Sequence, residues 1–517
     1  MPQIADPFDL TLLWPIRLRV SGGGKGKTAR EEARAAFAKS GSWIAVNDLV
    51  RRGESRDEDG FSYAELAYFH PFVREFLYGK GAVGEGGRHV FDVHELPATS
   101  ASSLEITEPG SESTFAIRRI LLYVFDGDIG ILTLQLQATR PVELETALNV
   151  ISYLRTAYFQ DYRPVVNKAD SGPGIVWKGG GGIELVRIRP LQAAPPEPPN
   201  DRLEEMREAI GSGKPAIYAH WHLLLKPLTD WGIEIDPLGD HRMGVMVFLG
   251  MEDLSSLSED QWFALAQADG GNFPRYAPAF RSKELAASVY DRWWDPSAHD
   301  PDALKHRYLA GPMTYCCVLK TPHEHIERIR TTWRRQHYQM FLLAHYQRAA
   351  LLVLQHRVSS AAARLQGKRQ RDLLREIQEI QGEMAVFSSR QWFTEISPQI
   401  QGRELYTLIA RQLELEALYD GVIHDKALLG NWAEARQGQR REEWRDRINR
   451  FVIPFALAAA VLNGHVFVEL LKNWVGLCPV LSPFSVDAIT WLIVLLAILV
   501  PWWLLLYFGS RRGGDQP

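Results

Sequence analysis

The chain has 517 residues, about three times the length of a usual single domain, so it can bury a sizeable core. Hydrophobic residues make up 46% of it and charged residues 23%, which excludes a disordered or collagen-like chain. The formal net charge of −4 gives no basic excess, so we expect no nucleic acid polymer as a partner. Three cysteines exclude a disulfide scaffold, and the adjacent Cys316 and Cys317 predict reduced thiols because neighbouring residues rarely bridge without strain.

Strand-like and helix-like patterns alternate at the start of the chain. Residues 10–20 predict a strand, and the Ala- and Glu-rich residues 27–39 predict a helix. Within residues 115–137, two apolar, β-prone runs flank the turn signal Asp126-Gly127-Asp128, which predicts a hairpin. The first part of the chain is therefore expected to be an α/β lobe over residues 1–192.

A second α/β part is expected over residues 200–325. Before it, residues 144–154 place apolar side chains at helical spacing, and the proline-rich residues 193–200 predict a stiff linker. Within it, the apolar runs 243–249 and 313–319 predict buried strands.

Residues 326–450 differ in composition and predict a helical stalk. Proline is absent between Pro322 and Pro398, and apolar residues recur at helical spacing there and in the following stretch. If the helix from residue 403 to residue 450 is continuous, it is roughly 70 Å long. Such a helix cannot bury its apolar stripe alone, so partner helices or further subunits are expected.

Residues 451–508 are the most apolar part of the chain. Asp, Glu, Lys and Arg are absent from residues 451–468 and 488–510, and about 20 apolar residues suffice to cross a bilayer. We therefore predict two transmembrane helices, 451–471 and 488–508; the alternative is one spanning helix and one buried helix. Arginines before the first and after the second predict a multi-pass protein of the inner (plasma) membrane with cytoplasmic N- and C-termini.

In its layout the chain resembles the CorA-like divalent-cation transporter superfamily. Those proteins have an α/β cytoplasmic domain followed by a long α-helical stalk and a C-terminal two-helix transmembrane hairpin, and we expect the same order here. The family carries Gly-Met-Asn at the outer end of the first membrane helix, whereas this sequence has LKNWVG at residues 471–476 and no Gly-Met-Asn anywhere. The resemblance implies a homo-oligomer of five copies in the lipid bilayer, Mg²⁺ or another divalent cation as the transported or regulatory ion, and no tightly bound cofactor.

Four polar residues are candidates for the pore lining: Asn463, His465, Glu469 and Asn473. Polar residues within a membrane span normally face a bundle interior or water. His465 and Glu469 are four residues apart and share a helix face, so repeated copies of Glu469 would form a carboxylate ring that attracts cations. Alternatively, Asn463 and His465 hydrogen-bond between helices while Glu469 extends to the surface. Asn473 is the residue that could replace the asparagine of the family signature.

Residues 21–28 (SGGGKGKT) follow the predicted strand and precede the predicted helix, as a phosphate-binding P-loop does. Serine stands at the first position, where that pattern needs glycine, and Asp126, which could hold magnesium, falls in the predicted hairpin turn. The alternative is a surface loop rich in glycine and lysine.

Two histidine pairs have one residue between their members: His220 with His222, and His323 with His325. On a strand, each pair would share a face and could bind a metal. The alternative is that they are structural or surface histidines.

We expect a divalent metal cation channel or transporter of the CorA-like type, gated by its cytoplasmic domain, rather than an enzyme. One alternative is a ligand-gated CorA-like membrane effector, such as those associated with type III CRISPR defence, which would respond to a nucleotide-derived messenger. The missing Gly-Met-Asn signature favours this effector. A further alternative is a membrane-anchored domain that conducts no ions.

Overall fold

The structure, a computed structural model, describes residues 3–20, 28–46, 67–78, 90–97, 103–108, 111–158, 174–178, 184–188, 211, 217–270, 276–294, 306–365 and 370–452. The chain divides into two compact units, Met1–Ala427 and Leu428–Pro517. The boundary falls within α13 (Leu415–Arg447), the longest of the described helices. The sheet and the helices that cover it lie in the first unit.

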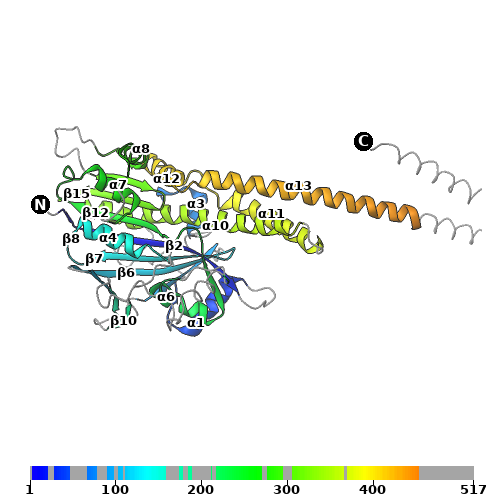
Figure 1. The fold of residues 1–517 in the computed structure, drawn as a ribbon, viewed down its shortest axis with the longest axis horizontal. Helices are drawn as coiled ribbons and strands as arrows, with labels where there is room; N and C mark the ends of the chain where they lie inside the picture. Colours follow the sequence, from blue (N-terminus) through cyan, green and yellow to red (C-terminus); the bar gives the residue numbers. More distant parts are fainter. Residues whose placement is uncertain are drawn as a thin grey trace, which may run out of the picture. The chain divides into compact units, whose positions relative to one another are not determined.

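Thirteen of the described strands form one sheet, with β2 (Phe8–Val20) in its interior (Figure 1). β2 pairs antiparallel with β7 (Ile129–Ala138) on one side, and with β11 (Ile233–Pro237) and β12 (Gly244–Met251) on the other. β12 pairs in parallel with β15 (Thr314–Lys320). The sheet also contains β3 (Ile44–Ala45), β4 (Phe91–Leu96), β5 (Ser103–Glu108), β6 (Ser111–Phe125), β9 (Gly174–Lys178), β10 (Glu184–Ile188), β13 (Val289–Tyr290) and β14 (His306–Gly311). β1 (Ile4–Ala5) and β8 (Val142–Glu143) pair separately.

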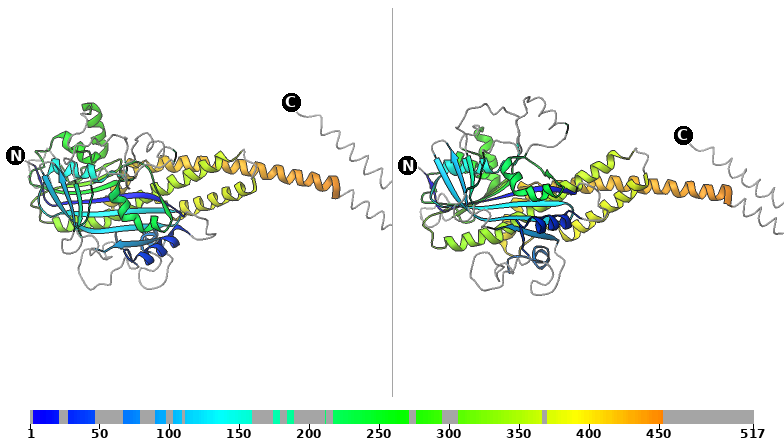
Figure 2. Two further views of the ribbon diagram at one scale, coloured as in Figure 1. Left: turned by 60° about the horizontal axis from the view of Figure 1, so that its bottom comes forward. Right: turned by 90° about the horizontal axis from the view of Figure 1, so that it is seen from below.

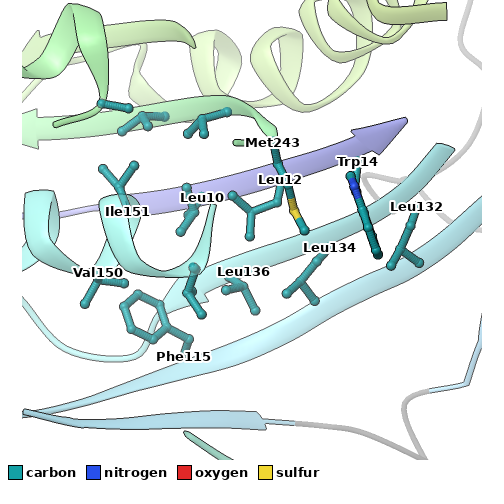
Figure 3. Close-up of a cluster of buried hydrophobic side chains, with 14 of the residues drawn as sticks. Leu10, Leu12, Trp14, Phe115, Leu132, Leu134, Leu136, Val150, Ile151 and Met243 are labelled. Atoms are coloured by element: carbon teal, nitrogen blue, oxygen red, sulfur yellow. The ribbon is translucent and has the colours of Figure 1, made fainter. Parts of the chain in front are cut away.

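Alternate side chains of β2 pack on opposite faces of the sheet, as the two-residue period of a strand requires. Leu10, Leu12 and Trp14 are buried in one core cluster, whereas Leu13 is buried in another. Figure 3 shows the first cluster, where side chains of β2, β7 and α4 (Leu144–Leu154) meet. Because both faces are apolar, both must be covered, which gives three layers of helices, sheet and helices.

Helices cover the two faces of the sheet (Figure 2). On the first face lie α1 (Ala29–Ser40), α4, α6 (Ala219–Asp230), α7 (Glu259–Gln267) and α8 (Pro278–Ser288). On the second face lie α3 (Pro71–Tyr78), α9 (Ile326–Thr332), the π-helical turn η2 (Trp333–His337), α10 (Tyr338–Ala363), α11 (Gln370–Arg390) and α12 (Ile400–Gln412). α1 and α6 are therefore on the opposite side of the sheet from α10 (Figure 1).

Several elements predicted from the sequence are confirmed. The strand over residues 10–20 is β2, and the helices over residues 27–39 and 144–154 are α1 and α4. The predicted hairpin consists of β6 and β7, joined by a turn in which Gly127 and Asp128 have positive φ. The two predicted buried strands are β12 and β15. Strands from both predicted α/β parts therefore join one sheet.

The thiols of Cys316 and Cys317 are free, as predicted. Both residues lie on β15, with Cys316 in the first core cluster and Cys317 in the second. Successive side chains of a strand point to opposite faces, so the two sulfur atoms cannot form a bond. Burial raises the pKa of both thiols and keeps them protonated.

The helix predicted over residues 403–450 is not continuous. α12 ends at Gln412 and α13 begins at Leu415, with Glu414 between them in the left-handed region at φ 54°. A second π-helical turn, η3 (Ile448–Val452), follows α13. Leu413 and Leu415 on either side of the break are both buried, although residues two apart lie on different faces of a continuous helix.

The predicted transmembrane hairpin is corrected by the structure. Among the residues that the structure describes, no helix is both long enough and apolar enough to cross a membrane; α10, for example, carries Arg348 and Arg357. The predicted spans, 451–471 and 488–508, lie outside the described residues apart from positions 451 and 452. The fold that is supported is an α/β fold with long helices. The predicted multi-pass localisation in the inner membrane is corrected on the same finding.

Candidate functional site

A cavity of about 630 Å³ lies between α1 and α6, on the first face of the sheet. Strands β4 and β9 contribute Leu96 and Trp177 to its wall. Pockets for small molecules usually measure about 300–1,000 Å³, so the volume is suited to such a ligand. The other lining residues are Ala36, Lys39, Ser40, Ser42, Trp43, Leu223, Leu224, Lys226, Pro227, Asp230 and Trp231.

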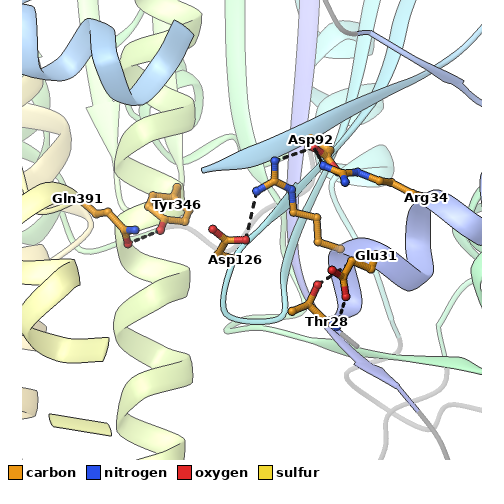
Figure 4. A network of polar contacts seen from close by, with 8 residues as sticks. Thr28, Glu31, Arg34, Asp92, Asp126, Tyr346 and Gln391 are labelled. Carbon is orange, nitrogen blue, oxygen red and sulfur yellow. Dashed lines mark hydrogen bonds and ion pairs between the residues drawn. The ribbon is translucent and has the colours of Figure 1, made fainter. Parts of the chain in front are cut away.

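The ends of α1 are fixed by its own sequence. At the N-terminus, the Thr28 hydroxyl accepts a hydrogen bond from the Glu31 backbone N–H, and the Glu31 carboxylate accepts one from the Thr28 backbone N–H at 3.0 Å (Figure 4). At the C-terminus, Gly41 adopts a left-handed φ of 64°, which glycine tolerates without strain. The chain reverses there and places Trp43 against Phe37, with 5.3 Å between the ring centroids.

The end of α6 brings a second tryptophan to the cavity. Trp231 caps α6, and Gly232, with φ 90°, leads the chain into β11. The indole Nε1 of Trp231 donates a hydrogen bond to the Glu32 carboxylate at 2.7 Å, and the Lys39 ammonium lies 5.0 Å from the centroid of the ring. Glu32 and Lys39 are both on α1, so Trp231 joins the two helices that border the cavity.

The three tryptophans of the lining differ in exposure. Trp43 and Trp177 are buried, whereas 37% of Trp231 is exposed. The Nε1 donor of Trp177 is buried and has no hydrogen-bond partner among the residues that the structure describes. A buried donor without a partner costs free energy, and an acceptor on a bound molecule would recover it.

Polar side chains complete the lining. Lys226 Nζ lies 2.7 Å from a carboxylate oxygen of Asp230, and the hydroxyl oxygens of Ser40 and Ser42 are 2.9 Å apart. The lining therefore offers flat apolar faces, ammonium groups and hydroxyls, while its carboxylate is already paired with a lysine. This composition is suited to holding a ligand.

A charged network anchors α1 to the sheet (Figure 4). Arg30 donates hydrogen bonds to Asp92 at 2.7 Å and to Asp126 at 3.2 Å, and Arg34 donates to Asp92 at 2.7 Å. Burial acts to raise the pKa of Asp92, but the hydrogen bonds from Arg34 and Arg30 outweigh it and lower that pKa. Asp92 therefore stays ionised and holds the helix that forms one wall of the cavity.

The four predicted pore residues, Asn463, His465, Glu469 and Asn473, lie outside the described residues. Their roles stay predictions.

The P-loop-like motif is described only at its last residue, Thr28, which caps α1. The strand before it, β2, is antiparallel to β7, β11 and β12, whereas a P-loop follows a strand of a parallel sheet. Asp126 lies in the hairpin turn, as predicted, and accepts a hydrogen bond from Arg30. These observations disfavour a P-loop, and residues 21–27 themselves lie outside the described residues.

The first histidine pair lies on a helix, α6, and not on a strand. His220 is buried beside Trp221, and burial lowers its pKa to about 3. In the second pair, the His325 backbone N–H donates a hydrogen bond to Nδ1 of His323 at 3.0 Å. Within the described part of the chain, no group of three or more His, Cys, Asp or Glu side chains is placed to hold a metal ion.

The cavity is not predicted from the sequence, although the sequence has local signals near two of its tryptophans. Trp43 follows a Ser-Gly-Ser turn after α1, and Trp231 precedes the glycine that ends α6. Trp177 has no such signal, because it reaches the site through the pairing of β9 with β5. That pairing is between segments distant in sequence.

Comparisons of the chain with protein-family models, with curated proteins and with solved structures find no match. The resemblance to the CorA-like superfamily therefore stays a prediction.

Proposed function

We propose that the α/β unit of this chain is a receptor for a small planar molecule, which binds in the cavity between α1 and α6. The observation that carries the proposal is the presence of three indole rings, those of Trp43, Trp177 and Trp231, around one volume. Aromatic side chains bind planar rings by stacking, which contributes about 1–3 kcal/mol for a nucleobase. The cavity of about 630 Å³ has room for a heterocycle with a polar substituent.

Two further observations support binding at this place. The unpartnered Nε1 of buried Trp177 is a donor that can orient a ligand acceptor. The two helices of the cavity are held by hydrogen bonds and ion pairs, from Trp231 to Glu32 and from Arg30 to Asp92, so the walls are formed before a ligand arrives.

The proposal agrees with one function considered from the sequence, a response to a nucleotide-derived messenger, because a nucleobase is a planar ring of suitable size. Divalent-cation transport, assembly into a homo-oligomer and the lack of enzymatic activity stay predictions. The receptor proposal depends on none of them.

Titration calorimetry on the full chain tests the proposal with four planar compounds: adenosine, AMP, indole-3-acetate and tryptamine. We expect at least one to bind saturably, with one site per chain. Trp231→Ala should weaken this binding about tenfold, because it removes a stacking surface. Leu223→Trp, which adds an indole to a lining position, should fill the cavity and abolish binding.

Two variants serve as matched controls. Trp293 and Val386 are 47% and 50% exposed and do not line this cavity. Trp293→Ala and Val386→Trp should therefore bind like the parent chain. The proposal is wrong if none of the four compounds binds, or if Leu223→Trp binds them as tightly as the parent.

A further inference from the structure

We infer that the molecule bound in this cavity is an anion whose negative group is held between Lys39 and Lys226, an inference that rests on the proposed function. The lining contains these two lysines and one aspartate, Asp230, so positive charge is in excess. Lys39 belongs to the last turn of α1 and Lys226 to α6. A group placed between the two helices can therefore be contacted from both sides.

Lys39 is the cation that a stacking ligand would displace. Its ammonium lies over the ring of Trp231, and among the described residues it has no carboxylate partner. A planar group that stacks on Trp231 removes this cation–π contact. If the same molecule carries a negative group, the displaced Lys39 gains a charge-assisted hydrogen bond in exchange. A planar anion is therefore favoured over a neutral ring or a planar cation.

Lys226 can also contact the anion, because weakening its ion pair with Asp230 costs little free energy. Its partner Asp230 is one helical turn away, and the two side chains are 56% and 61% exposed. Exposed ion pairs of this spacing contribute little to stability. The flexible stem and the three donors of the ammonium allow it to contact a ligand group while it keeps part of its contact with Asp230.

The negative groups near the cavity that would repel an anion already accept hydrogen bonds from the protein. Glu32 accepts the hydrogen bond of Trp231. The C-terminal ends of α1 and α6, whose dipoles disfavour an anion, accept backbone hydrogen bonds from Gly41 and Gly232 at 2.9 and 3.0 Å. The Trp177 Nε1 adds a donor that has no partner among the described residues, which favours an acceptor on the ligand.

Two matched ligand pairs test the charge of the ligand on the full chain. AMP and adenosine differ by a phosphate, and indole-3-acetate and tryptamine share an indole ring but carry opposite charges. We expect the anion of at least one pair to bind about tenfold more tightly than its partner, and raising NaCl from about 50 to about 500 mM to reduce this preference. If only AMP binds more tightly than its partner, the negative group is a phosphate. If indole-3-acetate also binds more tightly than tryptamine, the site accepts any compact anion.

Charge-removing variants test the position of the anion. Lys39→Met and Lys226→Met keep the apolar stem, and each should remove most of the anion preference while adenosine binding is retained. Lys283→Met alters an exposed lysine of α8 outside the cavity and should keep the preference. This inference is wrong if the two members of each ligand pair bind with equal affinity. It is also wrong if both Lys39→Met and Lys226→Met keep the anion preference. Neither result contradicts the receptor proposal. Failure of all four compounds to bind overturns both.

Discussion

His345 is a fully buried side chain that leaves no room for a side chain at position 244. It lies on α10, and its Nδ1 is 3.0 Å from the carbonyl oxygen of Phe341. Gly244 begins β12, and a Cβ added there would lie 2.7 Å from Cδ2 of the His345 ring. Packing, rather than an unusual backbone conformation, therefore requires glycine at this position.

Gly244→Ala is expected to lower the free energy of unfolding by about 2 kcal/mol, because the histidine ring or the strand must move. Urea unfolding followed by circular dichroism measures the change. Gly382→Ala is the matched control: position 382 is inside α11, and a Cβ there meets no atom within 4 Å. Alanine should stabilise that helix by up to about 1 kcal/mol. Two variants of equal stability would contradict this explanation.

At the scale of elements, Asp9 joins β2 to the helices on the second face of the sheet. Arg330 of α9 donates to its carboxylate at 2.8 and 2.6 Å, and Arg334 of η2 donates at 3.0 and 3.1 Å. Asp9 and Arg330 are 5% and 8% exposed. One buried carboxylate thus contacts two guanidinium groups from consecutive helical elements.

Asp9→Asn removes the negative charge that Arg330 and Arg334 share, and we expect it to lower the free energy of unfolding by about 3 kcal/mol. The same denaturation experiment measures this loss. Glu327→Gln is the control, because Glu327 lies 3.8 Å from Arg330 but is 68% exposed. That variant should change stability by less than about 0.5 kcal/mol. A loss as large as that of Asp9→Asn would show that burial does not set the strength of the contact.

Elements are predictable from this sequence where their signals are local. The β6–β7 turn and α1 depend on neighbouring residues, and both are predicted correctly. The break at Glu414 is missed because it depends on the left-handed φ of one glutamate, and no glycine or proline marks it in residues 403–420. The cavity is missed for a different reason: its tryptophans come from three separate segments, which only the pairing of the sheet and the packing of α1 on α6 bring together.

At the scale of the whole molecule, buried histidines make the fold sensitive to acid. Burial lowers the pKa of His94 and His345 to about 4, and that of His220 and His337 to about 3, from an ordinary value of 6.5. Below pH 6.5 these side chains take up protons in the unfolded chain but stay neutral in the folded chain. The unfolded state then binds more protons, so stability falls as the pH falls.

We expect the free energy of unfolding to change little between about pH 8 and pH 7, and to fall below about pH 6.5 by up to about 1.4 kcal/mol per pH unit for each of these histidines. Urea unfolding at intervals from about pH 8 to about pH 5 measures the slope, and most carboxylates titrate below that window. His345→Gln removes one of the titrating groups and should make the slope shallower, whatever it does to stability at high pH. A stability that stays constant down to about pH 5 would mean that the pKa values of these rings are the same in the folded and the unfolded chain.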